Sequence, residues 1–139
     1  MNLPADWEQR KLGRDLHHSY IVQAPAGSGK TELLTQRMLG LLARVENPEE
    51  VVAITFTRKA AAEMNHRLVG CLQAAAKAQK GEGGNETLKD HEQISRDLAL
   101  AVLQNDADQG WQLLEQTSRL RIRTIDSLCS ELARQLPVL

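Results

Sequence analysis

A glycine-rich run between an apolar segment and an amphipathic one constrains the fold of this chain more than any other feature. The run reads Ala24-Pro25-Ala26-Gly27-Ser28-Gly29-Lys30-Thr31. The apolar residues 20–22 before it are typical of a strand, which Pro25 and Gly27 would end. After the run, apolar side chains recur at helical spacing over residues 30–45. The sequence therefore predicts a strand, a loop and a helix in this order.

The glycines of this loop allow the backbone to approach phosphate groups closely. Without side chains at Gly27 and Gly29, successive N–H groups can point inward around phosphate oxygens, and the helix N-terminus adds a partial positive charge. Lys30 would place its ammonium on the β and γ phosphates, and Thr31 would offer its hydroxyl to Mg²⁺. We expect all eight residues of the run to bind ATP with Mg²⁺, with Lys30 and Thr31 as the catalytic members. The alternative is a glycine-rich turn without a ligand.

A second strand and helix are predicted next. Residues 51–56 are β-branched and continuously apolar, which is typical of a parallel strand covered on both faces. Thr57 is a good N-cap for a helix that extends to about Lys77. Residues 78–118 are interpreted as a flexible loop plus a helical insertion, with one helix around Ile94–Val102 and another around Trp111–Leu114.

The chain is then expected to return to a strand and end in a helix. Residues 120–125 form the strand, and from residue 119 onward three arginines alternate with less polar residues, so that one face should be wet. Residues 126–135 form the final helix. The arginines are Arg119, Arg121 and Arg123. The whole pattern predicts the α/β class, with a parallel sheet and flanking helices.

Composition narrows the partners and the location. The 139 residues, 42% of them hydrophobic, suit one soluble domain, and a net charge of -1 gives no overall reason to expect a nucleic-acid partner. No apolar run approaches the roughly 18 residues of a membrane span, so we expect a cytoplasmic protein without a membrane partner. Cys71 and Cys129 have no metal-binding or redox spacing and are interpreted as small core residues.

Two further blocks accompany the phosphate loop. One is Ile54-Thr55-Phe56-Thr57-Arg58-Lys59-Ala60-Ala61-Ala62-Glu63-Met64, and the other is Thr124-Ile125-Asp126-Ser127-Leu128-Cys129. In this order the three blocks resemble the UvrD/Rep-like superfamily 1 DNA helicases, with spacing closest to the RecB/AddA-like branch. The resemblance implies a P-loop (RecA-like) fold in which residues 1–139 form the N-terminal part of motor domain 1A.

The resemblance also implies ligands and partners. The intact parent would couple ATP hydrolysis to 3′-to-5′ movement on single-stranded DNA, a DNA-repair type of activity, and a nuclease domain or subunit would be a further partner. Gln9 would read the adenine edge, since an amide pairs with a donor and an acceptor together. The alternative for Gln9 is a surface position on a leading helix.

The second block resembles motif Ia, a single-strand DNA contact. Phe56 is the only phenylalanine and follows a predicted strand, where a base could stack on it with about 1–3 kcal/mol. Thr57, Arg58 and Lys59 at a helix N-terminus could bind phosphate oxygens. Arg58 stands where many relatives carry asparagine. The alternative places Phe56 in the core and leaves Lys59 a solvated cation.

For the third block, two roles stay open. Thr124 would be a second DNA contact or the N-cap of the last helix. A carboxylate repels a phosphate backbone, so Asp126 is expected to orient a neighbour or cap the helix rather than touch DNA.

A motor of this type also needs an acidic pair after an apolar strand. Asp90-His91-Glu92-Gln93 has a similar composition but follows no apolar strand, and Ser127 follows Asp126 where a glutamate would be needed. We therefore expect a truncated motor that binds nucleotide weakly and hydrolyses it negligibly. The alternatives are a self-contained P-loop kinase that uses Asp126, and a non-enzymatic module that binds nucleotide or DNA.

Overall fold

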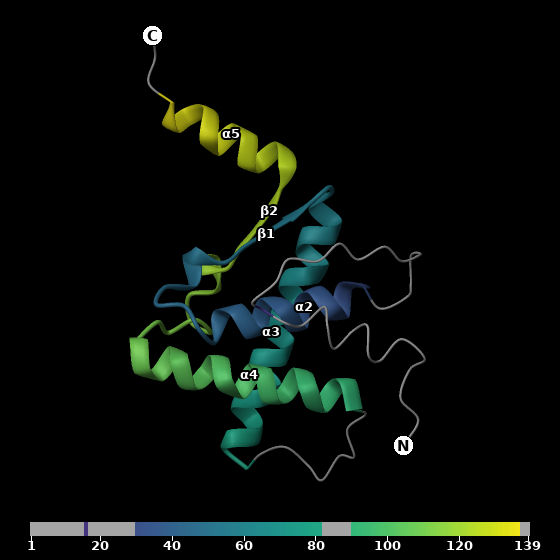
Figure 1. Cartoon of the computed structure of the whole chain (residues 1–139), viewed down its shortest axis with the longest axis vertical. Coiled ribbons are helices and arrows are strands. Elements are labelled where there is room, and N and C mark those ends of the chain that lie inside the picture. Colours follow the sequence, from purple (N-terminus) through teal and green to yellow (C-terminus); the bar gives the residue numbers. More distant parts are fainter. Residues whose placement is uncertain (1–15, 17–29, 82–89, 137–139) are drawn as a thin grey trace.

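The computed structural model describes residues 16, 30–81 and 90–136, which are mostly helical with one small parallel sheet (Figure 1). In chain order the elements are α2 (Lys30–Leu42), the short 3-10 helix η1 (Pro48–Glu50), β1 (Val52–Thr55), α3 (Arg58–Gln79), α4 (Asp90–Gln109), a second short 3-10 helix η2 (Thr117–Arg119), β2 (Arg121–Thr124) and α5 (Ile125–Gln135). The predicted strand at residues 20–22 lies outside the described part. The α/β order of the remaining elements is confirmed.

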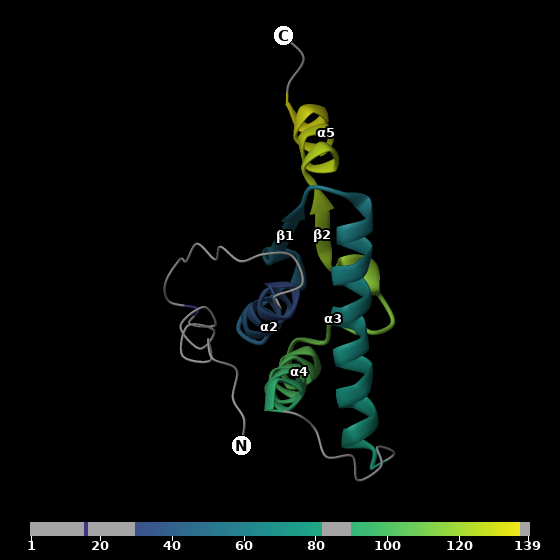
Figure 2. The ribbon, with the colours of Figure 1, turned by 90° about the vertical axis from the view of Figure 1, so that its right-hand side faces the viewer.

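The two strands pair in parallel, with Val52 opposite Arg121 and Thr55 opposite Thr124. A parallel pair needs a long crossover, which α3 and α4 provide here. Both strands consequently end at the same edge, where α3 and α5 begin (Figure 2). Each strand is shorter than the predicted one, because only four residues of each take part in the ladder.

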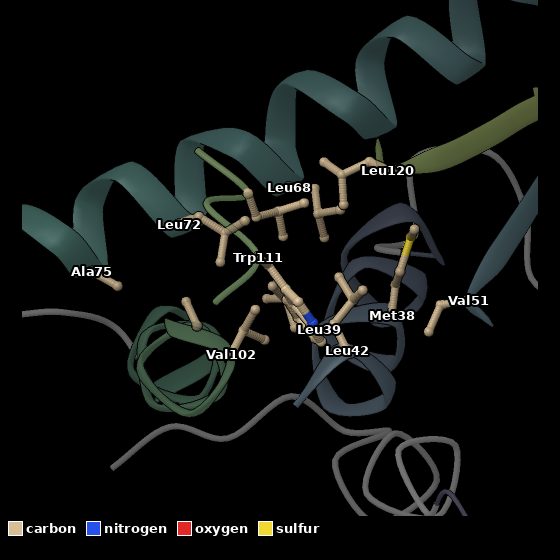
Figure 3. Close-up of a cluster of buried hydrophobic side chains, with 12 residues drawn as sticks. Met38, Leu39, Leu42, Val51, Leu68, Leu72, Ala75, Val102, Trp111 and Leu120 are labelled. Atoms are coloured by element: carbon tan, nitrogen blue, oxygen red, sulfur yellow. The ribbon is translucent and has the colours of Figure 1, made fainter. Parts of the chain in front are cut away.

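Three helices build the core, and α3 packs against the sheet. In Figure 2, α3 lies alongside the strands. Helices α2 and α4 run across the direction of α3 and are seen nearly end-on. Figure 3 shows their side chains pointing toward one another around Trp111. The fully buried members include Leu39 and Leu42 of α2, Leu68 and Leu72 of α3, and Val102 of α4. Burial of each such side chain contributes roughly 1.5–3 kcal/mol, so this cluster is the main source of stability.

The helix predicted around Trp111 and Leu114 is wrong. Gly110 and Gln112 have φ values of 73° and 58°, in the left-handed region that ends a right-handed helix. The Asp106 carboxylate accepts hydrogen bonds from the backbone N–H groups of Gln112 and Leu113, at 3.1 and 2.9 Å. Trp111 is instead buried by this turn, and its indole Nε1 donates to the Glu46 carbonyl at 2.7 Å.

The burial expected of β1 is also wrong. Ala53 faces the core, but Val52 and Ile54 on the opposite face are 43% and 53% exposed. Among the described helices, α3 packs against this strand on the side of Ala53. An apolar run identifies a strand without revealing whether both of its faces are covered.

The wet face predicted for β2 is only partly exposed to solvent. Arg121 and Arg123 are half-buried, because Glu131 of α5 lies 3.2 and 3.7 Å from their guanidinium nitrogens. With Leu128 and Leu132 these side chains line a hollow of about 520 Å³ between β2 and α5. The single carboxylate of Glu131 thus balances part of the positive charge on this strand face.

Three of the predicted helices are confirmed, with small shifts at their ends. The first helix begins at Lys30 as expected and ends at Leu42, the second begins after its N-cap Thr57, and the last runs over Ile125–Gln135. Cys129 is exposed on α5, so its expected core position is wrong, whereas Cys71 packs against the core and burial raises the pKa of its thiol. None of the described helices has the length and apolar character of a membrane span.

Candidate nucleotide and DNA interface

The candidate DNA-binding surface is the sheet edge at which both strands end. Thr55 and Thr124 are partners in the last rung of the ladder. This pairing brings the two blocks that begin at Ile54 and Thr124 next to each other, although about half of the chain separates them. Figure 1 shows both helix starts at this edge. Ligands of open α/β sheets bind beyond the carboxyl ends of the strands, so the position suits a binding surface.

Both helices that start at this edge are capped by a threonine. The Thr57 hydroxyl accepts from the Ala60 N–H at 3.0 Å, and the Thr124 hydroxyl accepts from the Ser127 N–H at 3.1 Å. The N-cap role considered for Thr124 is confirmed, and Asp126 lies in the first turn instead of at the cap. Two helix N-termini, each with a partial positive charge, therefore lie at one edge.

Thr55 fixes the loop that follows β1. Its hydroxyl Oγ1 lies 3.1 Å from the Thr57 carbonyl oxygen and 3.4 Å from the Arg123 carbonyl oxygen on the neighbouring strand. One hydroxyl proton directed at these two acceptors connects the loop to β2. Sequence reasoning missed this role, and its only signal was a threonine at the end of an apolar run.

Phe56 projects from this loop with 88% of its surface exposed. The alternative that placed it in the core is therefore excluded. A phenylalanine left in water forgoes roughly 1.5–3 kcal/mol of burial, which makes it a ready platform for a flat apolar partner. Arg58 and Lys59 are exposed in the first turn of α3 beside it. The surface combines an aromatic ring, two cations and two helix N-termini, which suits a base and its phosphates.

The predicted nucleotide site lies largely outside the described residues. Gln9 and the loop residues Ala24, Pro25, Ala26, Gly27, Ser28 and Gly29 are not described. Lys30 and Thr31 form the start of α2, which is the helix the loop pattern requires, and their side chains are not described. The ATP and Mg²⁺ roles of these residues stay predictions.

The acidic segment Asp90 to Gln93, which follows no apolar strand in the sequence, is helical. It forms the first turn of α4, away from the end of any described strand. His91 Nε2 lies 3.6 Å from Glu32 Oε1 at the start of α2. His91 and Glu32 thus lie where α4 meets α2. A catalytic acidic pair would instead follow the end of a strand.

Comparison with known proteins identifies the family of this chain. A parallel strand pair with helices that start at its C-terminal edge defines an α/β domain. The model of the UvrD/REP helicase N-terminal domain matches residues 5–138. The chain belongs to this family. The resemblance seen in the three sequence blocks is thereby confirmed.

Individual relatives agree with this assignment. ATP-dependent DNA helicase UvrD2 of Mycobacterium tuberculosis is 41% identical over 111 residues, which are 79% of this chain and 16% of that protein. DNA helicase II of Escherichia coli is 35% identical over 117 residues, 83% of this chain and 15% of that protein. An ATP-dependent helicase/nuclease subunit of Lactobacillus helveticus is 40% identical over 65 residues, 47% of this chain and 5% of that protein.

The chain thus spans about a sixth of the length of the first two relatives. No solved structure matches it.

Proposed function

We propose that this chain is the ATP-binding N-terminal portion of an ATP-dependent DNA helicase that translocates on single-stranded DNA. The observation that carries the proposal is the pairing of Thr55 with Thr124, which joins two of the three family blocks at one sheet edge. Membership of the helicase family supports the reaction, and the exposure of Phe56 supports the DNA contact.

In the nucleotide half of the proposal, residues 24–31 surround the phosphates of ATP. Lys30 contacts the β and γ phosphates, Thr31 ligates Mg²⁺, and Gln9 reads the adenine. The start of α2 at Lys30 fits this arrangement, because the first amides of a helix have no partner within the helix and can bind phosphate. Bound Mg²⁺ would neutralise charge on the phosphates.

In the DNA half, Phe56 stacks on a base, and Thr57, Arg58 and Lys59 bind phosphates. Thr124 contributes a further contact that is compatible with its N-cap bond. Its hydroxyl accepts from the Ser127 N–H, and accepting a hydrogen bond leaves the hydroxyl proton able to donate to a phosphate oxygen. Stacking does not depend on base identity, which suits a protein that moves along DNA.

Fluorescence anisotropy with a labelled single-stranded oligonucleotide tests the DNA half. Phe56→Ala is expected to weaken binding about tenfold, as loss of one stacked base would, whereas Phe56→Tyr retains the ring and the affinity. Lys59→Ala should reduce both the affinity and its dependence on salt. Lys77→Ala, at the exposed far end of α3, is the matched control and should have no effect. Equal weak binding by all five proteins would remove the assignment.

Two parts of the proposal concern the intact protein. The nuclease domain or subunit proposed as a partner draws support from the helicase/nuclease relative, and co-purification with the full-length protein would test it. The cytoplasmic location is likewise proposed, and cell fractionation would test it.

A further inference from the structure

The start of α4 contacts α2 through buried polar groups beside the apolar core. Gln36 of α2 and Ser95 of α4 are 3% and 9% exposed. The Gln36 side-chain nitrogen lies 3.1 Å from the His91 carbonyl oxygen and 3.1 Å from the Ser95 hydroxyl. Ser95 in turn donates to the His91 carbonyl at 3.1 Å. We call these three residues the α2–α4 polar contact.

The middle of the interface consists of apolar side chains, including Leu39 and Leu42 of α2 with Ala99 and Val102 of α4. Apolar burial has no directional preference, so such contacts alone tolerate neighbouring registers of one helix along the other. Hydrogen bonds have strict distances and angles, and buried donors need acceptors. The polar contact therefore fixes the N-terminal half of α2 against the start of α4.

The axial position of α2 matters at the end of the helix nearest the predicted phosphate loop. The helix begins at Lys30, fewer than two turns before Gln36. A shift of one residue along the axis moves the helix by about 1.5 Å. Hydrogen bonds form over a narrow range of about 2.7–3.2 Å, so a displacement of this size would weaken contacts between the start of α2 and a bound phosphate.

We propose that Gln36 is a positioning residue for nucleotide binding, which acts through α2 by holding Lys30 and Thr31 in place against the start of α4. This inference rests on the proposed ATP site. The hydrogen-bond partners of Gln36 are Ser95 and the backbone carbonyl of His91. The sequence gives no reason to connect residues 36 and 91–95, because they are far apart in the chain and lie on different helices.

The test compares nucleotide affinity in variants of the full chain by isothermal titration with MgATP. Gln36→Met keeps the length of the side chain without its amide and should weaken binding about tenfold. Ser95→Ala leaves the bond between Gln36 and the His91 carbonyl and should weaken binding less. Titrations are run where urea denaturation shows every variant to be folded, so that a loss of stability alone cannot lower the measured affinity.

Asn105→Leu is the matched control. Asn105 of α4 donates to the carbonyls of Leu42 and Val45 at 2.9 and 2.8 Å, at the opposite end of α2. This variant also removes polar bonds between the same two parts of the chain. It should lower stability and leave the nucleotide affinity within twofold of the wild type.

The outcomes separate this inference from the proposed function. Wild-type affinity in Gln36→Met, or an equal loss in Asn105→Leu, would overturn the positioning role and leave the ATP site standing. Absence of binding by the wild type, or unchanged binding by Lys30→Ala, would overturn the ATP site and the positioning role together. A tenfold loss confined to Gln36→Met and, in smaller measure, Ser95→Ala supports it.

Discussion

Arg119 and Glu49 form a bidentate ion pair at the sheet edge where both strands begin, with nitrogen–oxygen distances of 2.6 and 3.1 Å. Glu49 lies in η1 immediately before β1, and Arg119 lies in η2 immediately before β2. At the other edge, Thr55 pairs with Thr124. The short ladder is therefore connected at both ends, and its register places the two sequence blocks side by side.

Glu49→Gln should make the stability of the chain less dependent on pH. The hydrogen bond from Arg119 holds the pKa of Glu49 below its usual 4.5 in the folded chain. A carboxyl with a lowered pKa stabilises the fold above its unfolded value, and this contribution is lost as the pH falls through the lower, folded value. Urea denaturation from pH 7 to pH 3 should show a small loss of stability in the variant at neutral pH and a shallower decline below about pH 4.5.

The exposed Glu115 offers a control for that experiment, since Glu115→Gln removes a carboxylate of the same type outside the ion pair. Identical pH profiles for Glu49→Gln and Glu115→Gln would contradict the role given to the pair.

Thr124→Ala should destabilise the chain by about 1 kcal/mol, because it removes the side-chain acceptor of the Ser127 N–H. Thr124→Ser retains the hydroxyl and should stay near the wild type. The free energy of unfolding in urea measures both changes. An alanine variant as stable as the serine variant would show that the cap contributes nothing.

Hydrolysis by this chain alone should be negligible, because the sequence has no acidic pair directly after an apolar strand to ligate magnesium and orient the attacking water. The expected turnover in a steady-state assay with MgATP and single-stranded DNA lies well below about 1 s⁻¹, the low end of typical enzyme rates. Turnover at or above that rate would show that another residue supplies this chemistry.

Local patterns predicted most of the described fold. Helical spacing located α2, α3 and α5, and Thr57 was correctly identified as an N-cap because its side chain bonds within one turn of the same helix. A continuous apolar run located β1, and the alternation of arginines with less polar residues located β2. Because these features depend on residues close together in the chain, they can be recognised from a short stretch of sequence.

What could not be predicted depends on distant parts of the chain. The exposed face of β1 and the bridge from Glu131 to Arg121 and Arg123 arise from packing between elements. The turn at Trp111 required a left-handed Gln112 and a carboxylate from Asp106, neither of which interrupts the apolar spacing.

For the candidate site too, local sequence patterns predicted some features, and others required the tertiary structure. The residues of the DNA surface were named from their blocks, and the exposure of Phe56 excluded the alternative core position. The meeting of Thr55 with Thr124 and the contact of Gln36 with Ser95 required the tertiary structure, since both pairs join residues from different elements.

Nucleotide binding is the central claim, and isothermal titration of MgATP into the wild type and Lys30→Ala tests it most directly. Lys77→Ala, which removes an exposed lysine at the far end of α3, is the control for the loss of one positive charge. We predict measurable, weak binding by the wild type and the control, and none by Lys30→Ala. Binding of ATP by Lys30→Ala with wild-type affinity would contradict the claim.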